Sequence, residues 1–380
     1  MTDTTRRRLL LAAPPLVLVL ALSVWVWTQS ISATVLDLPG ALTDREFWAL
    51  VEDYSEAGGF FRSDNLVSNE DTFQHVIPEL TRIVRPGGVY LGVGPDQNFT
   101  YLAALRPKLA FIVDIRRGNL HAHLMYKALF ELSEDRATFL SKLFSRPAPD
   151  GVGRDVPPGE LFDAFVNARP DRQAYEDNLQ AIYRQLTEVH GFRLARGDRE
   201  GIEYVYSSFF AAGPFLAYSN AGGGMFARRN PRYPSFQALQ VATDGEGHHR
   251  AYLASDEAYQ AVRAMQRANL IVPLVGNFAG PKALRAVGAY LRDRGATVTA
   301  FYTSNVEQYL FQDRIWGEFA RNVMALPLGE SSTFIRSCFN TCDSPVGSRS
   351  VTKLDSMPGL MADFAAGRIT SYWDVTMHTR

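Results

Sequence analysis

The residues best suited to chemistry lie between Gly88 and Arg117, in the stretch GVYLGVGPDQNFTYLAALRPKLAFIVDIRR. Gly92 and Gly94 end a short apolar run, and Asp114 stands twenty residues after Gly94. In nucleotide-binding βαβ units, glycines at the first turn let the backbone approach the ligand, and an acid at the tip of the second strand accepts bonds from ribose hydroxyls. The spacing predicts a nucleotide-type ligand here, with an ordinary tight turn and a solvated carboxylate as the alternative.

Three polar side chains beside these positions are further candidates for holding a cofactor. Asp96 and Asn98 follow the first apolar run, and Arg116 follows the second. All three would then lie at the carboxyl ends of strands, where open α/β sheets bind ligands. Asp96 is equally suited to be the N-cap of the helix that begins there, and Arg116 could be an exposed arginine without a ligand.

Later apolar runs also end in polar side chains. Asn277 follows LIVPLVG, and Tyr302, Ser304 and Asn305 end or follow TVTAFYTS. We expect these four residues to bind a substrate at the same edge of the sheet. Ser304 or Asn305 could instead cap the next helix. The combined set is polar and aromatic with few strong bases, which favours binding or group transfer over hydrolysis.

Signatures of hydrolytic and metal-dependent enzymes are missing from the sequence. It contains no G-x-S-x-G, H-E-x-x-H or Walker motif, and we expect no metal site. The two cysteines, Cys338 and Cys342, could form a disulfide in an oxidising compartment, remain free thiols, or supply half of a metal site.

The elements that must position these residues follow from apolar runs that alternate with amphipathic stretches. This alternation predicts an α/β fold with a doubly wound, mostly parallel sheet. A middle insertion at about 147–255 is expected to contain a hairpin around Asp244 and Gly245. Before the first strand, residues 34–87 predict a helical lead-in, with its second helix beginning at Ser68 or Asn69. The predicted strands are 89–94, 109–115, 270–276, 297–304 and 332–337.

The unit around Gly92, Gly94 and Asp114 resembles motif I and the following acidic position of class I S-adenosylmethionine-dependent methyltransferases. Two longer stretches, GVGPDQNFTYLAALRPKLAFIVDIRRGNLHAHLMYKALFELS and LIVPLVGNFAGPKALRAVGAYLRDRGATVTAFYTSNVEQYLF, are similar to an uncharacterised bacterial family with this type of fold. The resemblance covers roughly residue 65 to the last residue. It implies a Rossmann-like, methyltransferase-type core over residues 88–380 and S-adenosylmethionine as the cofactor.

The chain departs from the methyltransferase pattern at two positions. Tyr90 stands where that family has an acid, and Asp96 stands where it has a third glycine. These departures weaken the implied contacts to the amino-acid end of the cofactor, whereas Asp114 keeps the implied contact to its ribose.

The first 33 residues have the features of a targeting or anchoring segment. Arg6, Arg7 and Arg8 precede a run from Leu9 to Trp27 without a charged residue. Such a segment is typical of an uncleaved membrane anchor or a cleaved signal peptide, and a buried N-terminal helix is a third alternative. The first two place the rest of the chain outside the cytoplasm, at the cell membrane or in the periplasm or medium.

Composition describes a globular chain without an electrostatic preference for nucleic acid. The 380 residues are 46% hydrophobic and carry 39 basic and 40 acidic side chains. The leading interpretation is an exported or membrane-anchored protein with a methyltransferase-like nucleotide-binding core that transfers a methyl group. The alternative is a non-catalytic envelope protein that binds a small ligand or a partner on the same scaffold.

Overall fold

The structure, a computed structural model, describes residues 37–148, 154–218, 233–339, 342, 345 and 347–378. Residues 37–380 form one compact unit. The leader predicted at residues 1–33 lies outside the described residues. Within the described ranges, no helix is both long and apolar enough to cross a membrane.

A six-stranded sheet forms the centre of this unit, with the strand order β3-β2-β1-β4-β5-β6. The first five strands are parallel, and β6 runs antiparallel to β5. Every residue of β1, β2 and β3 is buried, as expected for parallel strands covered on both faces. The predicted α/β class with a mostly parallel sheet is therefore confirmed. The strands are β1 (Val89–Gly92), β2 (Leu109–Asp114), β3 (Ile271–Val275), β4 (Val298–Ser304), β5 (Leu328–Phe339) and β6 (Ser350–Ser356).

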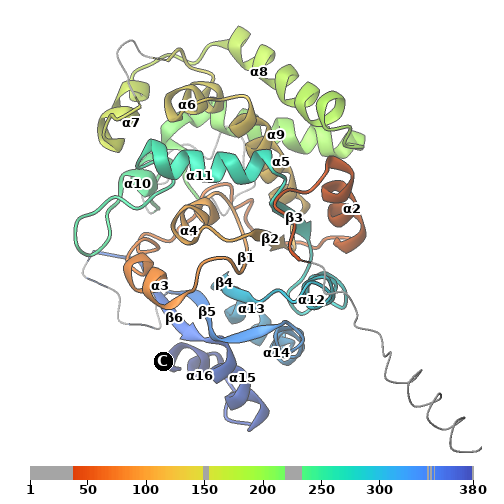
Figure 1. Cartoon of the computed structure of the whole chain (residues 1–380). Coiled ribbons are helices and arrows are strands. Elements are labelled where there is room, and N and C mark those ends of the chain that lie inside the picture. Colours follow the sequence, from red (N-terminus) through yellow and green to blue (C-terminus); the bar gives the residue numbers. More distant parts are fainter. Residues whose placement is uncertain are drawn as a thin grey trace, which may run out of the picture. The chain divides into compact units, whose positions relative to one another are not determined.

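Helices cover both faces of the sheet (Figure 1). One face carries α4, α5 and α11, which pack against one another, and the opposite face carries α12, α14 and α15. The bounds of these six are α4 (Gln97–Leu105), α5 (Arg117–Glu131), α11 (Asp256–Arg267), α12 (Ala283–Arg292), α14 (Trp316–Met324) and α15 (Met357–Ala365). Around them lie α2 (Asp44–Tyr54), α3 (Ile77–Ile83), α13 (Val306–Gln312) and α16 (Tyr372–Met377).

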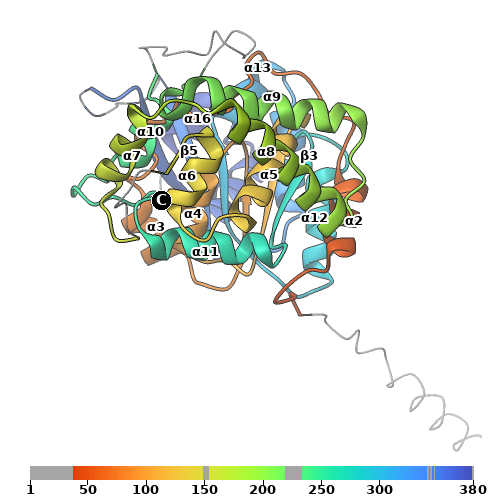
Figure 2. The ribbon, with the colours of Figure 1, turned by 90° about the horizontal axis from the view of Figure 1, so that it is seen from above.

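A further group of helices lies between β2 and β3 in the sequence and forms an outer layer over α5 (Figures 1 and 2). Because α9 packs on its outer side, α5 is buried continuously from Asn119 to Phe130. The outer layer thus turns α5 into an interior helix whose polar residues need partners within the protein. The group comprises α6 (Arg136–Phe144), α7 (Pro158–Val166), α8 (Arg172–Arg184), a π-helical turn (Gln185–Val189), α9 (Arg196–Ala212), a 3₁₀ turn (Gly213–Phe215) and α10 (Phe236–Val241).

The prediction of a hairpin around Asp244 and Gly245 is wrong. Residues 237–241 belong to α10, and no strand forms between there and β3. The Asp244 carboxylate accepts hydrogen bonds from the backbone N–H groups of Glu246 and His248, both at 2.9 Å, and pairs with Arg250 at 2.8 Å. This side chain binds the backbone groups that a hairpin ladder would need, so the segment closes as a loop.

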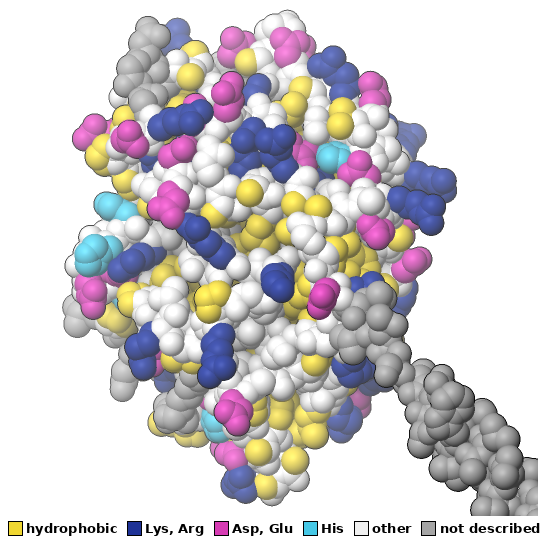
Figure 3. Space-filling model, in the orientation of Figure 1, with side chains coloured by type: hydrophobic (Ala, Val, Ile, Leu, Met, Phe, Trp, Pro, Cys, Tyr) yellow, Lys and Arg dark blue, Asp and Glu magenta, His cyan; other side chains and the backbone are white. Residues whose placement is uncertain are grey.

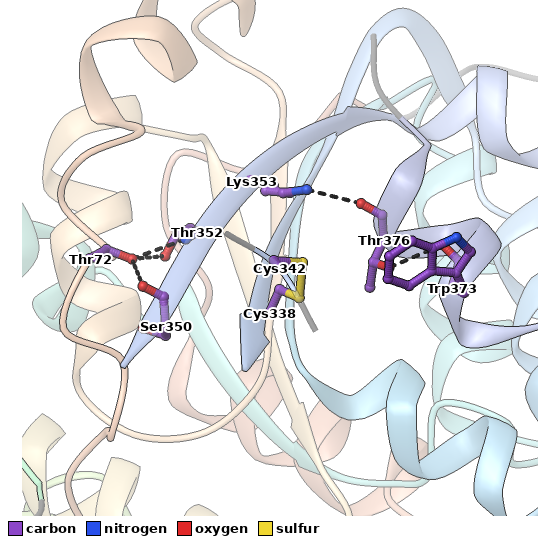
Figure 4. Close-up of a disulfide and its surroundings, with 8 residues drawn as sticks. All are labelled: Thr72, Cys338, Cys342, Ser350, Thr352, Lys353, Trp373 and Thr376. Atoms are coloured by element: carbon purple, nitrogen blue, oxygen red, sulfur yellow. Dashed lines mark hydrogen bonds between the residues drawn. A yellow bond between two sulfur atoms is a disulfide. The ribbon is translucent and has the colours of Figure 1, made fainter. Parts of the chain in front are cut away.

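Strand β6 holds the segment that precedes β1, and a disulfide lies near the end of β5 (Figure 4). The Thr72 hydroxyl donates to the Ser350 carbonyl at 3.1 Å and accepts from the Thr352 backbone N–H at 3.0 Å. A disulfide joins Cys338, the last buried residue of β5, to Cys342. An early segment of the chain is therefore attached to the last strand of the sheet.

Charges are distributed without a dominant sign on the face shown in Figure 3. Acidic and basic side chains are interspersed there, in keeping with a formal net charge of −1. This face offers no continuous basic stripe of the kind that binds nucleic acid.

A buried ionic cluster fastens α13 to the sheet. The Arg336 guanidinium, on β5, pairs with Glu307 on α13 and Asp355 on β6, and all three side chains are at most 8% exposed. Trp316 Nε1 also donates to Glu307 at 3.1 Å, and His378 lies 2.7 Å from Asp355. Since α13 directly follows the end of β4, this cluster fixes the position of that strand end.

We predict that Arg336→Met lowers the free energy of unfolding by about 3–5 kcal/mol, because it leaves two buried carboxylates without a cation. Denaturant titration of the full chain measures this loss. Arg82→Met is the matched control, since the Arg82–Glu79 pair is 74% and 59% exposed and its removal should cost less than about 1 kcal/mol. Equal losses for the two variants would contradict a structural role for the cluster.

Candidate functional site

A cavity of about 200 Å³ lies at the carboxyl ends of β1, β2, β3 and β4. Parallel strands place these ends along one edge of the sheet, so residues far apart in the sequence meet there. The structure brings seven of the ten ligand-binding candidates from the sequence to this cavity. They are Gly94, Asp114, Arg116, Asn277, Tyr302, Ser304 and Asn305.

The other three candidates, Gly92, Asp96 and Asn98, are buried beside the cavity and do not line it. Asn98 Nδ2 donates to the carbonyls of Val93, Gly94 and Pro95, and its Oδ1 accepts from the Tyr90 hydroxyl at 2.8 Å. A Cβ added at Gly92 would lie 2.0 Å from that same Oδ1. Gly92 therefore makes room for the Asn98 side chain, and Asn98 shapes the turn.

Gly94 contributes backbone to the cavity wall. Its φ of +78° lies in the region that favours glycine, and its carbonyl lies 2.9 Å from His123 Nε2. Burial lowers the pKa of His123 to about 4, so the ring is neutral and can donate to this carbonyl. The turn is thus held from behind by Asn98 and His123, and its open side faces the cavity.

Asp114 is paired with Arg116 within the same strand end. Oδ1 accepts from the Arg116 backbone N–H at 2.9 Å and from Nε at 3.0 Å, while Oδ2 accepts from Nη2 at 2.6 Å. Arg116 Nη1 also donates to the carbonyl of Asp64. Because Oδ2 accepts a single bond, it retains capacity for one hydroxyl donor, but the charge of Asp114 is already compensated.

Glu70 is the residue that the sequence analysis missed. Its carboxylate is 1% exposed and accepts four hydrogen bonds, all from neutral groups. Tyr302 Oη at 2.8 Å and Ser304 Oγ donate to Oε1, and Gln97 Nε2 at 2.9 Å and Ser337 Oγ donate to Oε2. Burial raises the pKa of Glu70 above its usual value, and these four bonds only partly oppose that rise. Within the described part of the chain, this carboxyl group of the cavity therefore has no positively charged partner.

The position of Glu70 explains why sequence patterns did not reveal it. The helix expected from Ser68 or Asn69 begins only at Ile77, and residues 65–70 form an irregular segment that enters the cavity. The Ser68 hydroxyl accepts from the Glu70 backbone N–H at 3.2 Å, so it shapes this segment in place of capping a helix. No local periodicity marks such a segment. The sequence shows only that residue 70 is a glutamate, and it does not show that this side chain is buried.

The polar residues at the ends of β3 and β4 have separate roles. Ser304 has a φ of +52°, which turns the backbone, and its hydroxyl donates to Glu70. Asn305 occupies the N-cap position of α13 but makes no capping bond with its side chain. Asn277 Oδ1 accepts from the Ala279 backbone N–H at 2.9 Å. Of these, Ser304 belongs to the Glu70 network, and Asn305 lines the cavity with its Oδ1 3.4 Å from the Ser304 hydroxyl.

Aromatic side chains form the outer wall of the cavity. Phe61 packs edge-on against Tyr309 with ring centroids 5.1 Å apart, and Tyr218 and Phe60 complete the wall. Phe60 is 87% exposed, which is unusual for a large apolar side chain at the mouth of a cavity. The arrangement combines a buried acid at the base with aromatic surfaces at the entrance.

Asp244, Glu246 and His248 place potential metal-ligand atoms within 4.8 Å of one another. Asp244 is already bound to Arg250 and to two backbone N–H groups, and the other two side chains are exposed. These three residues lie outside the cavity, and Asp244 serves to close the loop that contains them.

We predict that Asp96→Asn stabilises the protein at pH 8 but not at pH 4. Asp96 is 2% exposed and accepts from Gln240 Nε2 at 2.9 Å, and burial raises the pKa of Asp96 to about 7. Between pH 4 and 7 the unfolded chain loses this proton while the folded chain keeps it, so wild-type stability falls as pH rises. The asparagine removes that penalty, worth up to about 4 kcal/mol above pH 7.

Denaturant titrations at the two pH values measure this difference. Asp53→Asn, at an exposed position of α2, is the control and should change stability by less than about 0.5 kcal/mol at both. A gain that is the same at pH 4 and pH 8 would contradict the assignment.

Comparison with known proteins identifies a family. A search of the curated proteins found no match. The model of the family described as Domain of unknown function (DUF7790) matches residues 65–191 and 228–353, which include Glu70 and the strand ends around the cavity. The expectation of a methyltransferase-like protein is corrected accordingly, because this family is of unknown function. The predicted membrane span lies outside the described residues, and within the described ranges no helix is long and apolar enough to cross a membrane. Since the match extends over more than half of its residues, the chain belongs to the family Domain of unknown function (DUF7790).

Proposed function

We propose that this protein binds a small, positively charged organic molecule in the cavity at the carboxyl edge of its sheet. The observation that carries the proposal is Glu70, a carboxylate in the cavity base whose four partners are all neutral. Burying a carboxylate without a cation is costly, and a cationic ligand removes that cost when it binds.

The strand order supports a Rossmann-like arrangement of this site. In the order β3-β2-β1-β4-β5-β6 the direction of winding reverses between β1 and β4. Open sheets of this order bind their ligands in the crevice at that reversal, outside the carboxyl ends of the strands. The cavity lies at this point, which favours a ligand site over a packing defect.

The charges around the cavity discriminate between ligand classes. Its lining includes the acids Glu70, Asp114 and Asp313 and one base, Arg116. With Asp114 and Arg116 compensating each other, the charge that remains among the described lining residues is negative, which disfavours the phosphates of a dinucleotide. Among the cofactors considered from the sequence, S-adenosylmethionine carries a positive sulfonium and fits this sign.

The size and remaining contacts of the cavity limit how such a ligand binds. About 200 Å³ is below the range of roughly 300–1,000 Å³ typical of pockets for drug-sized ligands, so the cavity encloses only one end of a molecule as large as S-adenosylmethionine. Asp114 Oδ2 has capacity for one further hydroxyl, and the aromatic wall offers surfaces for a planar ring. The cationic group would then lie towards Glu70.

We predict that the full-length protein binds S-adenosylmethionine with a micromolar Kd and binds S-adenosylhomocysteine at least about 10-fold more weakly. The two molecules differ by the methyl group and the sulfonium charge, and one such interaction is worth about 1.4 kcal/mol or more. Isothermal titration calorimetry measures both affinities, with NAD⁺ as an anionic nucleotide that should not bind. Equal affinities for the two adenosyl ligands, or no binding of either, would refute the cationic-ligand proposal.

We further predict that Glu70→Gln weakens binding of S-adenosylmethionine by about 10- to 100-fold, because the amide removes the negative charge but keeps the size of the side chain. Asp313→Asn is the matched control at the exposed rim, where solvent screens the charge and the loss should stay below about 3-fold. Thermal unfolding of both variants verifies that they are folded. Loss of affinity in both variants to the same degree would count against Glu70 as the specific partner.

A further inference from the structure

A second cavity, of about 260 Å³, adjoins the first. Phe60, Phe61 and Arg116 line both cavities. The second cavity lies between the segment before β1, the start of α5 and the middle of α9. It contains none of the four residues that the sequence assigned to a substrate.

A histidine in the wall of this second cavity is paired with an aspartate that does not itself line it. His121, on α5, places Nε2 at 2.9 Å from Asp198 Oδ1, on α9. Asp198 is 3% exposed, and its Oδ1 also accepts from Arg117 Nε at 2.7 Å while its Oδ2 accepts from the Ala195 backbone N–H at 3.0 Å. The carboxylate is therefore fixed by three protein groups and presents one oxygen to the histidine.

These contacts define the tautomer of His121. Burial opposes ionisation of Asp198, but hydrogen bonds from Arg117 and His121 outweigh it and lower the pKa of Asp198, so the carboxylate is ionised and can only accept. Burial also lowers the pKa of His121, despite the opposing effect of Asp198, so the ring is neutral. The single ring proton then lies on Nε2, and Nδ1 is left as a hydrogen-bond acceptor.

Gly201 makes the space in which this ring lies. A Cβ added at Gly201 would come within 1.9 Å of His121 Nδ1, so any larger residue at this position of α9 would displace the ring. Gly201 and His121 both line the second cavity. In the described part of the chain, Nδ1 has no hydrogen-bond partner.

The remaining surface of the second cavity does not favour an anion. Its two arginines, Arg116 and Arg117, are paired with Asp114 and Asp198 respectively. The Asp64 carboxylate, in the same lining, accepts from the Tyr204 hydroxyl at 2.6 Å. Phe60 and Phe61 supply apolar surface on the side shared with the first cavity. A small molecule with an aromatic body and one hydroxyl or amine hydrogen matches both the apolar wall and the acceptor nitrogen.

We propose that the second cavity is a separate binding site for a small aromatic alcohol or amine, which donates its hydrogen to His121 Nδ1. His121 thereby acts as a ligand-binding residue oriented by Asp198, and Gly201 gives it room. The site itself does not depend on the cationic ligand proposed for the first cavity.

The test uses the full-length protein and two fluorinated probes observed by ¹⁹F NMR titration. 4-Fluorophenol carries the donor hydrogen, and 4-fluoroanisole has the same ring with the hydrogen replaced by a methyl group. We expect 4-fluorophenol to bind about 5- to 10-fold more tightly, the range of one neutral hydrogen bond. Equal affinities of the wild-type protein for the two probes, or no binding of 4-fluorophenol, would overturn the proposal.

Variants assign that binding to His121. His121→Phe should reduce 4-fluorophenol affinity to that of 4-fluoroanisole, and His121→Gln, which keeps an acceptor oxygen, should recover part of the difference. Gly201→Ala, which displaces the ring, provides a second test if His121→Phe does not fold. Affinity that is unchanged in every folded variant of these three would place the probe elsewhere and refute the assignment.

Glu70→Gln separates this proposal from the proposed function. It should leave 4-fluorophenol binding unchanged while it weakens binding of S-adenosylmethionine, because Glu70 lines only the first cavity. If S-adenosylmethionine fails to bind but 4-fluorophenol shows the expected dependence on His121, the second site stands and the first proposal fails. Parallel loss of 4-fluorophenol binding in Glu70→Gln would contradict two separate sites.

Discussion

The constraint on which the site depends is the burial of the Glu70 carboxylate among neutral donors. Its four hydrogen bonds come from α4, from the end of β4 and from β5, so one side chain joins three elements at the edge of the sheet. Hydroxyl and amide groups stabilise a buried carboxylate less than a cation does, and the charge therefore remains available to a ligand. A structural ion pair at this point would have closed the cavity to charged molecules.

At the same edge of the sheet, other buried acids are paired with arginines. Arg336 is buried between Glu307 and Asp355, and Asp114 is paired with Arg116. In both cases the acids have a guanidinium within direct contact, so the arrangement serves to hold elements together. Glu70 is as buried as Glu307 and Asp355, but its hydrogen-bond partners are neutral, whereas theirs include a guanidinium. Comparison of these acids is what separates the ligand site from the scaffold.

Much of the scaffold could be predicted from the sequence, because buried parallel strands appear as unbroken apolar runs. The runs at 109–115 and 270–276 became β2 and β3, and the polar residues after them met at one edge. Strand β6 was missed since Ser350, Thr352 and Lys353 interrupt any apolar run, as is usual for an edge strand. The hairpin prediction failed because the Asp244 side chain accepts hydrogen bonds from nearby backbone N–H groups, and the pattern of apolar residues does not reveal such bonds.

The site was predictable only where it consists of strand ends. Asp114 and Ser304 are the last residues of their strands and Gly94 lies two residues after β1, so topology alone places them together. Glu70, His121 and Asp198 lie on an irregular segment or on helix faces, and their meeting depends on how α9 packs over α5 and how β6 holds the segment before β1. Such contacts join residues up to 280 positions apart and leave no spacing rule in the sequence.

The attachment of Thr72 to β6 has a consequence for the order of assembly. Ribosomes make Thr72 long before Ser350 and Thr352, and the intervening residues must emerge before those bonds can close. In a nascent chain whose central strands have already formed, the segment that carries Glu70 would not yet be attached to β6. Contacts between residues so far apart in the sequence form slowly. On the proposed function, the ability to bind a ligand would therefore arise only in the final stage of biogenesis, and a ribosome-bound or prematurely ended polypeptide would not bind it.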